Sequence, residues 1–413
     1  MYKRLYSFLH KNSFLYNYQF GFRKYHSTAL ALVELTDSLY SHLDNHETII
    51  GMYFDLQKAF DTVDHEILLT KLYNYGVRGS INDWFRDYLT NRKQFVAIGD
   101  SVSELGTIRC GVPQGSVLGP LLFLIYVNDI CNISDECTVK LVADDTNLFV
   151  FGKDSRSAFC TANTLIVQLN MWFVANKLSL SIDKTCYSVF GRRNHNYSVD
   201  SVINLNDNVL TEVDKCKYLG LMIDNKLTWR PHIDYVYSKL LKFTGIFYKL
   251  RWHVSNTVLR MLYFAFVHSH LLYGIEVYGN TSKSNINKLL ILNNKILRIA
   301  QNKPLQYRVL NLYKNYNTLP LPELHNYQLL CLVHKYHYRN DKMHAMFSNY
   351  FSSNKDIHYH HTRSSSLLHL SSVSTSVGTK STKFKASQLW NTLLERLRKS
   401  RTLILLKLNC PFT

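Results

Sequence analysis

The stretch that most constrains this chain is Val139–Phe151, V-K-L-V-A-D-D-T-N-L-F-V-F, in which two apolar runs flank two adjacent aspartates. Each run is about five residues long and rich in β-branched and aromatic side chains, a composition typical of strands. The pattern therefore predicts a β-hairpin with Asp144 and Asp145 at its turn. An acidic turn alone is more often solvated than catalytic, so a functional interpretation needs a further carboxylate in a matching context.

That carboxylate is Asp55, which directly follows the apolar run Thr48–Phe54 and so lies at another predicted strand end. Three carboxylates on neighbouring strand ends repel one another unless cations neutralise them. Mg²⁺ is bound in proteins by carboxylates together with substrate phosphates. Asp55, Asp144 and Asp145 are therefore the predicted catalytic and metal-binding residues of a two-metal phosphoryl or nucleotidyl transfer site.

Three motifs occur in order along the chain: D-L-Q-K-A-F at 55–60, G-V-P-Q-G-S at 111–116 and A-D-D at 143–145. Their order and spacing resemble the polymerase motifs of reverse transcriptases from LINE-type (non-LTR) retrotransposons, in particular the jockey-like group. Further matches are Q-F-G-F-R at 19–23, Lys184-Thr185 and Y-L-G at 218–220. The resemblance covers residues 1–300 strongly and residues 300–413 weakly.

This resemblance implies an RNA-directed DNA polymerase with an α+β, right-hand polymerase fold. Its parts would be fingers, a palm with an antiparallel sheet, a helical thumb, and a helical or irregular basic C-terminal extension. The implied cofactors are two Mg²⁺ ions, with Mn²⁺ as a substitute, and the implied partners are an RNA template, a DNA primer and dNTPs. The expected boundaries are fingers at 1–47 and 69–106, palm at 48–68 and 107–228, thumb at 229–313 and the extension at 314–413.

The resemblance also implies roles for side chains near the aspartates, each with a plainer alternative. Arg23 would contact the incoming triphosphate, because a guanidinium fork fits phosphate oxygens; the alternative is a surface arginine. Phe60 would be a steric gate that excludes a ribose 2′-hydroxyl, and the alternative is a core phenylalanine. Lys184 would act as general acid toward the pyrophosphate leaving group, or be an ordinary solvated lysine.

The G-V-P-Q-G-S loop is expected to contact the substrate. Gln114 would hydrogen-bond near the templating base or the nucleotide. Gly115 and the neighbouring glycines allow the backbone to approach a flat substrate closely. Helices are predicted at 64–75, with Asp64 as N-cap and Gly76 as stop, at 117–130 after this loop, at 165–176 and at 257–272. A serine-rich stretch at 364–382 is predicted to be mobile.

The charge of the chain is concentrated in its C-terminal part. Residues 251–413 hold 22 Lys and Arg against 5 Asp and Glu, whereas residues 1–250 hold 26 against 25. A one-sided excess of this kind suggests that a polyanion binds along the C-terminal part, with an acidic chemical centre upstream. The alternative is a generally basic surface, which would spread the charge more evenly.

The sequence shows no cleavable signal, no segment of membrane-spanning length and no C-x-x-C pair. These observations predict an intracellular protein, nuclear or cytoplasmic, that binds no membrane. The first fingers strand and the upstream endonuclease of the family are absent from the sequence, so the chain is expected to be N-terminally truncated. The alternative function is therefore an inactive RNA-binding relic or maturase-like fragment. The intact aspartates and Phe60 favour the enzyme, because a pure binder does not need a self-repelling carboxylate triad.

Overall fold

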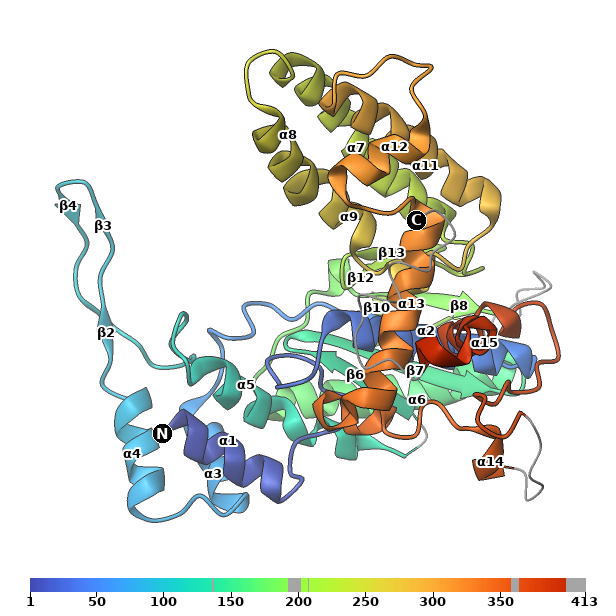
Figure 1. The fold of residues 1–413 in the computed structure, drawn as a ribbon. Helices are drawn as coiled ribbons and strands as arrows, with labels where there is room; N and C mark the ends of the chain where they lie inside the picture. The colour runs from blue at the N-terminus through green and yellow to red at the C-terminus, as the bar shows by residue number, and fades with distance from the viewer. Residues whose placement is uncertain (136, 192–201, 207, 358–363, 399–413) are drawn as a thin grey trace. The chain divides into compact units, whose positions relative to one another are not determined.

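The computed structural model describes residues 1–135, 137–191, 202–206, 208–357 and 364–398. These residues form two compact units (Figure 1), the first made of Met1–Thr28 and Glu47–Val213, the second of Ala29–His46 and Asp214–Thr413. The predicted thumb and C-terminal extension thus fall in one unit. That unit also includes most of a helix from the segment predicted as fingers.

The first unit is built on a five-stranded sheet of β1 (Thr48–Phe54), β6 (Cys137–Val142), β7 (Asp145–Gly152), β8 (Cys186–Phe190) and β11 (Thr211–Glu212). The strand order is β11-β8-β1-β7-β6. β1 pairs antiparallel with β7 and β8, β7 pairs antiparallel with β6, and the short β11 runs parallel to β8. All seven residues of β1 are buried, so this strand runs through the core.

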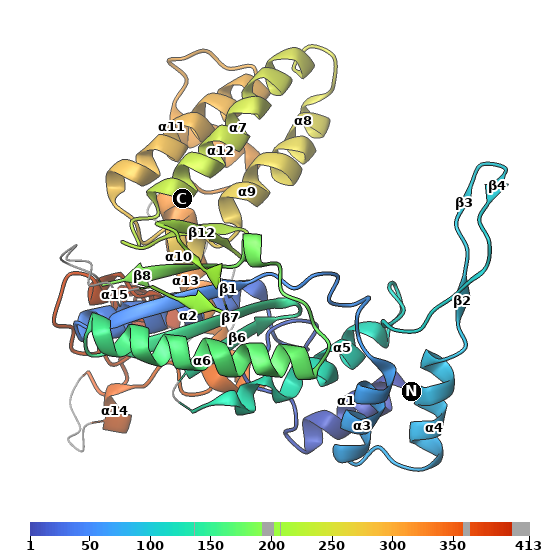
Figure 2. The same ribbon diagram turned by 180° about the vertical axis from the view of Figure 1, so that it is seen from behind.

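Helix α6 (Ser155–Ala175) lies across one face of this sheet (Figure 2). It begins earlier than predicted, because Asp154 and Ser157 form a reciprocal capping box ahead of the apolar segment. Contrary to the expectation from the sequence, α6 is long and apolar enough to cross a membrane by length and composition. One set of its apolar side chains, among them Phe159, Leu165 and Phe173, is buried in the core of the first unit, whereas Val167, Met171 and Val174 are exposed.

The other helical segments of the first unit are α1 (Tyr2–Lys11), α3 (His65–Asn74), α4 (Ser80–Leu89), α5 (Gly119–Val127), and the 3₁₀ turns η1 (Asn128–Ile133) and η2 (Ile182–Lys184). α3 begins after Asp64, whose side chain accepts a hydrogen bond from the Ile67 backbone N–H at 3.0 Å. The chain leaves this helix at Gly76, where φ is +93°. The predicted N-cap and the predicted glycine stop are both confirmed.

A long β-hairpin extends from the end of α4 (Figure 1). Its short strands are β2 (Lys93–Gln94), β3 (Ala97–Ile98), β4 (Ser101–Val102) and β5 (Gly106–Thr107), with β2 paired to β5 and β3 to β4. The apolar side chains of this hairpin are exposed, and Ile98 has 76% of its surface accessible. A second small ribbon is formed by β9 (Asn204–Leu205) and β10 (Asn208–Val209).

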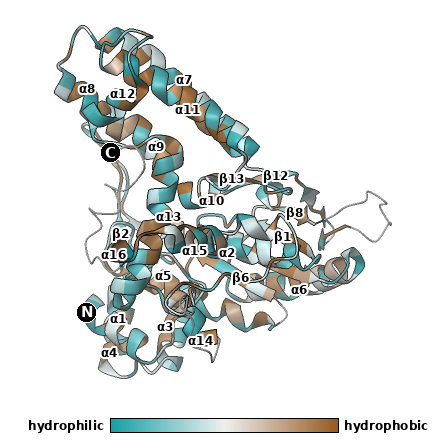
Figure 3. Ribbon diagram, turned by 45° about the vertical axis from the view of Figure 1, so that its right-hand side comes forward, coloured by the Kyte–Doolittle hydropathy of each residue, from teal (hydrophilic) through white to brown (hydrophobic). Residues whose placement is uncertain are grey.

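In the second unit, the hairpin of β12 (Lys215–Tyr218) and β13 (Leu221–Asp224) precedes a helical region. Helices α7 (Arg230–Leu250) and α11 (Lys283–Ala300) pack side by side, and each carries both polar and apolar residues (Figure 3). In the sequence, α7 and α11 are separated by four segments: α8 (Asn256–Leu262), the π-helical turn η3 (Tyr263–His268), α9 (Ser269–Leu272) and α10 (Ile275–Tyr278). The helix predicted over 257–272 is therefore present, with a π-helical turn in its middle.

The C-terminal part continues as a folded portion of the second unit. Its segments are α12 (Val309–Tyr316), α13 (Leu321–Tyr338), η4 (Asn340–Lys342), η5 (Ala345–Phe347), α14 (Asn354–Ile357), η6 (Gly378–Lys380), α15 (Thr382–Thr392) and α16 (Glu395–Arg398). α13 and α15 pack against each other, with Leu329, Val333 and Trp390 in a common apolar cluster.

Helix α2 (Thr28–Asp44) is bound by this C-terminal part through a half-buried carboxylate. Asp37 accepts hydrogen bonds from the backbone N–H groups of Thr382 and Lys383, at 2.7 and 2.8 Å, and from the hydroxyl of Tyr350. The two N–H groups belong to the first turn of α15, where backbone donors lack helical partners. Asp37 therefore caps the N-terminus of α15, a helix that is distant from it in the sequence.

A second carboxylate of α2 binds the serine-rich stretch. Asp44 accepts hydrogen bonds from the backbone N–H groups of Ser374 and Thr375 at 2.8 and 2.7 Å, and from the Thr375 hydroxyl. This end of the stretch was expected from composition to be mobile. In the structure its backbone donors are instead held by α2, because a buried carboxylate satisfies several of them together.

Candidate active site

The three predicted aspartates come from two adjacent strands of the sheet. In the antiparallel pair of β1 and β7, Phe54 lies opposite Thr146, so Asp55 and Asp145 follow as the next positions at the same end. Val142 pairs with Asp145 across the β6–β7 hairpin. The turn therefore consists of Ala143 and Asp144, and Asp145 is the first residue of β7 rather than a turn residue.

The electrostatics of Asp145 indicate that the three carboxylates are close together. Desolvation by the surrounding protein raises the pKa of the Asp145 carboxyl, and the negative charges of Asp144 and Asp55 raise this pKa further. Mutual repulsion of this kind is the physical reason why such a cluster favours a bound cation. The register and the charges together place one acidic centre at this end of the sheet.

Lys184 lies beside this acidic centre. Its Nζ is 3.2 Å from Asp55 Oδ2, and both side chains are largely exposed to solvent. The neighbouring backbone is held in place because Ser181 N–H donates to the Asp55 carbonyl at 2.8 Å and Gln57 N–H donates to the Ser179 carbonyl at 2.9 Å. The structure thus brings Lys184 to Asp55, as the motif order suggested, although 129 positions separate them in the sequence.

The donor chemistry of the acidic centre suits a divalent metal. Carboxylate oxygens are the protein ligands that Mg²⁺ and Mn²⁺ accept. Within the described ranges, no group of three or more His, Cys, Asp and Glu side chains is spaced to hold a metal ion. The residues nevertheless fit such an ion in their donor chemistry, because the strand register puts Asp55 and Asp145 at the same end of adjacent strands, with Asp144 in the turn beside them.

The ring of Phe60 is fixed by two other aromatic rings. It stacks on Phe123 of α5 with centroids 4.3 Å apart, and it meets the exposed ring of Phe22 edge-on at 6.2 Å. Phe60 is half-buried, so one part of its ring contributes to the core and another part is open to solvent. The two interpretations of this residue, gate and core side chain, are compatible in this arrangement.

The G-V-P-Q-G-S loop borders an open cavity of about 730 Å³. Gln114 on this loop donates to Asp61 Oδ1 at 2.7 Å. Gly111, with φ +86°, approaches the Asp61 backbone so closely that a Cβ would lie 2.7 Å from its carbonyl oxygen. The cavity is also lined by the basic side chains of Lys58 and Arg92. Asp61, which links two of the motifs, was not singled out from the sequence.

Gly115 and Arg23 differ in their contacts with the rest of the protein. Gly115 has φ +79°, and a Cβ there would meet no atom within 4 Å, so its glycine is explained by backbone conformation and not by packing. Arg23 is half-buried and uses one nitrogen, Nη1, to donate to the carbonyls of Tyr16 and Gln19 at 2.5 and 3.2 Å. Burial lowers the pKa of Arg23. Its role toward a triphosphate stays a prediction.

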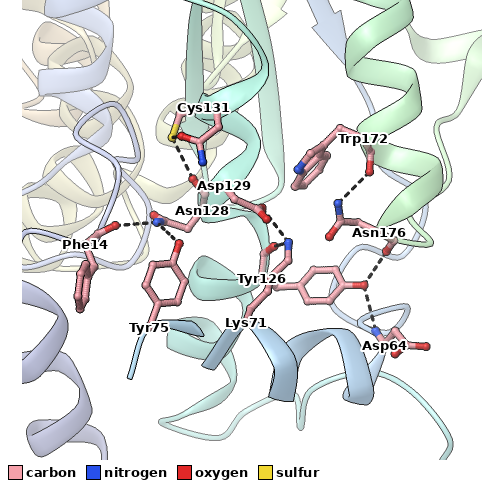
Figure 4. A network of polar contacts seen from close by, with 11 residues as sticks. Phe14, Asp64, Lys71, Tyr75, Tyr126, Asn128, Asp129, Cys131, Trp172 and Asn176 are labelled. Carbon is pink, nitrogen blue, oxygen red and sulfur yellow. Dashed lines mark hydrogen bonds and ion pairs between the residues drawn. The ribbon is translucent and has the colours of Figure 1, made fainter. Parts of the chain in front are cut away.

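A network of polar contacts joins α3, α5 and the end of α6 (Figure 4). Lys71 donates to Asp129 at 2.7 Å and to the Tyr126 carbonyl at 2.5 Å. The Tyr126 hydroxyl donates to the Asn176 carbonyl at 2.5 Å and accepts from the Asp64 N–H at 3.3 Å. Burial lowers the pKa of Lys71, and the hydrogen bond to Asp129 opposes this shift. The network fixes the segments that follow the first two motifs relative to each other.

Residues 1–223 match the family model described as "Reverse transcriptase (RNA-dependent DNA polymerase)". The chain belongs to this reverse transcriptase family. Membership confirms the predicted α+β, right-hand polymerase fold and the resemblance read from the three motifs.

Two relatives illustrate the similarity. The chain is 29% identical over 333 residues to a probable RNA-directed DNA polymerase from transposon BS of Drosophila melanogaster, covering 76% of this chain and 36% of that protein. It is 27% identical over 320 residues to the RNA-directed DNA polymerase from the mobile element jockey of the same organism, covering 74% and 34%. The chain thus spans about a third of the length of these curated relatives.

Among solved structures, the chain is similar to the telomerase from Candida albicans, whose structure is a complex with the TWJ fragment of telomeric RNA. The TM-score is 0.40 at 14% sequence identity, covering 83% of this chain and 54% of that chain. The telomerase from Candida tropicalis, with the TWJ fragment of telomeric RNA, gives a TM-score of 0.34 at 12% identity over 69% of this chain and 52% of that chain.

Proposed function

We propose that this chain is an RNA-directed DNA polymerase, which copies an RNA template by adding dNTPs to a DNA primer. The observation that carries the proposal is the register of β1 and β7, which brings Asp55 and Asp145 to the same end of adjacent strands with Asp144 in the turn. The relatives named as RNA-directed DNA polymerases support it.

Asp55, Asp144 and Asp145 would hold two Mg²⁺ ions. Bound there, the ions would lower the pKa of the primer 3′-hydroxyl and neutralise the triphosphate and the leaving group. The 3′-hydroxyl loses its proton to solvent, its oxygen forms a bond to the α-phosphorus of the dNTP, and the bond from that phosphorus to the oxygen of pyrophosphate breaks. Lys184, whose Nζ lies 3.2 Å from Asp55, would give a proton to the departing pyrophosphate.

The remaining site residues would select and orient the substrates. Phe60 would lie under the sugar of the nucleotide. Gln114, which lines the 730 Å³ cavity, and its neighbour Gly115 would contact the template base or the nucleotide. Arg23 would contact phosphate through Nη2, because Nη1 donates to two backbone carbonyls and Nε is buried. Residues 229–313 would form the thumb and, with the extension, hold the RNA–DNA hybrid through their basic side chains.

The test is primer extension by the purified chain on poly(rA)/oligo(dT) with and without Mg²⁺. We expect Asp144→Asn and Asp55→Asn each to abolish divalent-dependent extension while binding of the hybrid is kept, because these side chains hold metal and not nucleic acid. Asp87→Asn, an exposed residue of α4, removes the same charge away from the site and serves as control. Near-parental extension by either site variant would contradict the two-metal assignment.

The second candidate function is an inactive RNA-binding relic of the same fold. It predicts binding of the hybrid by the parent chain with no extension under any divalent ion. The same assay therefore separates the two functions.

A further inference from the structure

The segment Tyr18–Phe20 lies along the free edge of β6, next to the turn that carries Asp144. Phe20 N–H donates to the Leu141 carbonyl at 2.8 Å, and Leu141 N–H donates to the Tyr18 carbonyl at 3.0 Å. Gln19 forms a parallel bridge with Leu141. These bonds are main-chain bonds, so they fix the position of the segment without regard to its side chains.

The Gln19 side chain reaches from this edge to the turn itself. Its Oε1 accepts a hydrogen bond from Ala143 N–H at 3.0 Å and another from Gly21 N–H at 2.8 Å. Gln19 is only 1% exposed, so both bonds are shielded from water. The backbone donor of the residue immediately before Asp144 is thus held by a side chain 124 positions earlier in the sequence.

Ala143 needs this support because of its backbone conformation. Its φ is +59°, in the left-handed region that alanine adopts at an energetic cost, and two-residue hairpin turns normally use Asn or Gly there. A residue kept in this region requires surroundings that hold it there. The hydrogen bond from Ala143 N–H to Gln19 is such a restraint, and it acts on the peptide next to a predicted metal ligand.

Gly21 also helps to accommodate the Ala143–Asp144 turn, because it has no side chain to clash with the Ala143 backbone. A Cβ at position 21 would lie 2.3 Å from Ala143 N and 2.9 Å from its Cα, closer than atoms can approach. These atoms are backbone, so the clash could be relieved only by moving the turn. The Q-F-G sequence therefore supplies both the acceptor for the turn and the gap into which the turn fits.

Packing alone does not explain a glutamine at this position. In the described part of the chain, Gln19 Nε2 is buried without a hydrogen-bond partner. An unpaired buried donor is unfavourable, so an apolar side chain of similar size would fill the space better if nothing depended on Oε1. The acceptor function toward the turn is the feature that an apolar residue lacks.

We propose that Gln19 is a positioning residue for the polymerase reaction, which fixes the Ala143–Asp144 turn so that the Asp144 carboxylate is held in place to bind metal. The proposal depends on the proposed polymerase function only for the expected effect on kcat; the expected effect on metal binding does not depend on it. Residues that orient metal ligands through hydrogen bonds typically change metal affinity or activity when they are replaced.

The experiment compares the full-length chain with Gln19→Met, which keeps the side-chain length but removes the acceptor. Mn²⁺ binding to the free protein is followed by the electron paramagnetic resonance signal of unbound Mn²⁺, and single-nucleotide incorporation and hybrid binding are measured in parallel. We expect Mn²⁺ affinity and kcat each to fall by roughly 10–100-fold, with the Kd for the hybrid in metal-free buffer unchanged. Gln19→Glu keeps an oxygen acceptor of equal reach and should retain more turnover than Gln19→Met.

Gln301→Met is the matched control for a buried glutamine with a structural role. Gln301 donates to the Leu312 carbonyl at 2.8 Å and accepts from Asn315 at 3.0 Å, all within the second unit. Its replacement should lower thermal stability without changing Mn²⁺ affinity. Gly21→Ala is the second test variant, because its methyl group pushes on the turn and leaves Gln19 in place; it should also weaken Mn²⁺ binding.

If Gln19→Met and Gly21→Ala bind Mn²⁺ as the parent does, or lose no more affinity than Gln301→Met, the positioning role is wrong. An effect of Gln19→Met on hybrid binding equal to its effect on kcat would assign the residue to the general fold and would also overturn the proposal. If the parent fails to extend a primer, the proposed function fails, and the Mn²⁺ titration still decides the role of Gln19.

Discussion

The ring of Phe60 owes its position to α5 rather than to the loop that carries it. Its stacking partner, Phe123, is fully buried, so the pair cannot separate without opening the core of the first unit. A ring held in this way can act as a barrier, because it does not move aside at low cost when a larger sugar arrives. The half-buried position of Phe60 is therefore compatible with a role as a steric gate.

Phe60→Val should therefore admit ribonucleotides. Removing the ring clears the space that a 2′-hydroxyl would need, and the ratio of rNTP to dNTP incorporation should rise by roughly 10–100-fold, the range expected when a pocket loses a small steric block. The measurement is a side-by-side kcat/KM for dTTP and UTP on poly(rA)/oligo(dT). Phe8→Val, on α1, makes the same change outside the site, and an unchanged ratio in Phe60→Val would leave Phe60 as a core residue only.

At the scale of single residues, the sequence indicates the candidate site residues better than it indicates the residues that hold them in place. Asp55, Asp144, Asp145 and Lys184 are visible because each belongs to a short motif with its own context. Asp61, which accepts a hydrogen bond from Gln114, carries no such signal, because its partner lies 53 positions away. An interaction of that range is decided by tertiary structure and cannot be read from local pattern.

The attachment of α15 to α2 makes the second unit sensitive to pH. Burial raises the pKa of Asp37 to about 6, and the hydrogen bonds from Tyr350, Lys383 and Thr382 oppose the shift. A carboxyl whose pKa is higher in the folded protein binds its proton more tightly there than in the unfolded chain. The resulting stabilisation is complete below the unfolded pKa, near 4, and is lost as pH rises through about 6.

We expect the melting temperature of the parent to fall between pH 4 and pH 6.5 by an amount that reflects on the order of 2 kcal/mol, since one pKa unit corresponds to about 1.4 kcal/mol. Asp37→Asn does not titrate, so its melting temperature should lack this component, although it loses one accepted N–H bond at every pH. Circular dichroism melts of both proteins at matched pH values provide the comparison. Parallel pH profiles for the two would show that Asp37 does not couple to folding.

Asp44 on the same helix provides a contrast of opposite sign. Burial opposes ionisation of this carboxyl, but hydrogen bonds from Thr375, Ser374 and Gly378 lower its pKa overall. Its contribution to stability is present above the unfolded pKa and is lost as pH falls. Asp44→Asn should therefore cost stability at neutral pH and have less effect in acid, as measured by the same melts.

Whole secondary-structure elements could be predicted where periodicity or caps mark them. β1, the β6–β7 hairpin, and α3 with its Asp64 cap and Gly76 stop were all visible in this way. The start of α6 was missed, because S-R-S-A-F-C carries no helical apolar period and its signal is the capping box at Asp154. The long hairpin after α4 was missed because its strands are short and their apolar residues are exposed, which removes the alternation that marks a half-buried strand.

At the scale of the whole molecule, removing the C-terminal part would change both the charge of the protein and the contacts that α2 makes. Residues 251–413 carry most of the excess positive charge, but they also supply the partners of α2. A fragment ending near residue 230 would therefore lack Thr382, Lys383 and Ser374 and leave two carboxylates of α2 without their hydrogen bonds. Point substitutions on the exposed basic surface test nucleic-acid binding more cleanly than truncation.

Replacing Lys295, Lys303 and Lys314 with Gln removes three exposed charges from the second unit. For each phosphate that these lysines no longer neutralise, the slope of log K against log[salt] for an RNA–DNA hybrid should become shallower by roughly 0.7–0.9, because fewer counterions are released. The control replaces Lys3, Lys11 and Lys153, exposed lysines of the first unit, and should leave the slope nearly unchanged. Equal slopes in both triple variants would mean that the basic C-terminal surface is merely solvated.

Because α2 is hydrogen-bonded to residues near 375–383, these contacts can form only late in the synthesis of the protein. The ribosome delivers α2 early and completes the first unit at residue 213, but the N–H groups that satisfy Asp37 are not yet synthesised. At the usual elongation rates of about 5–20 residues per second, roughly 170 further residues take on the order of 10–30 seconds. During that interval Asp37 and Asp44 of α2 lack the hydrogen bonds that they accept from residues 374–383 in the folded protein.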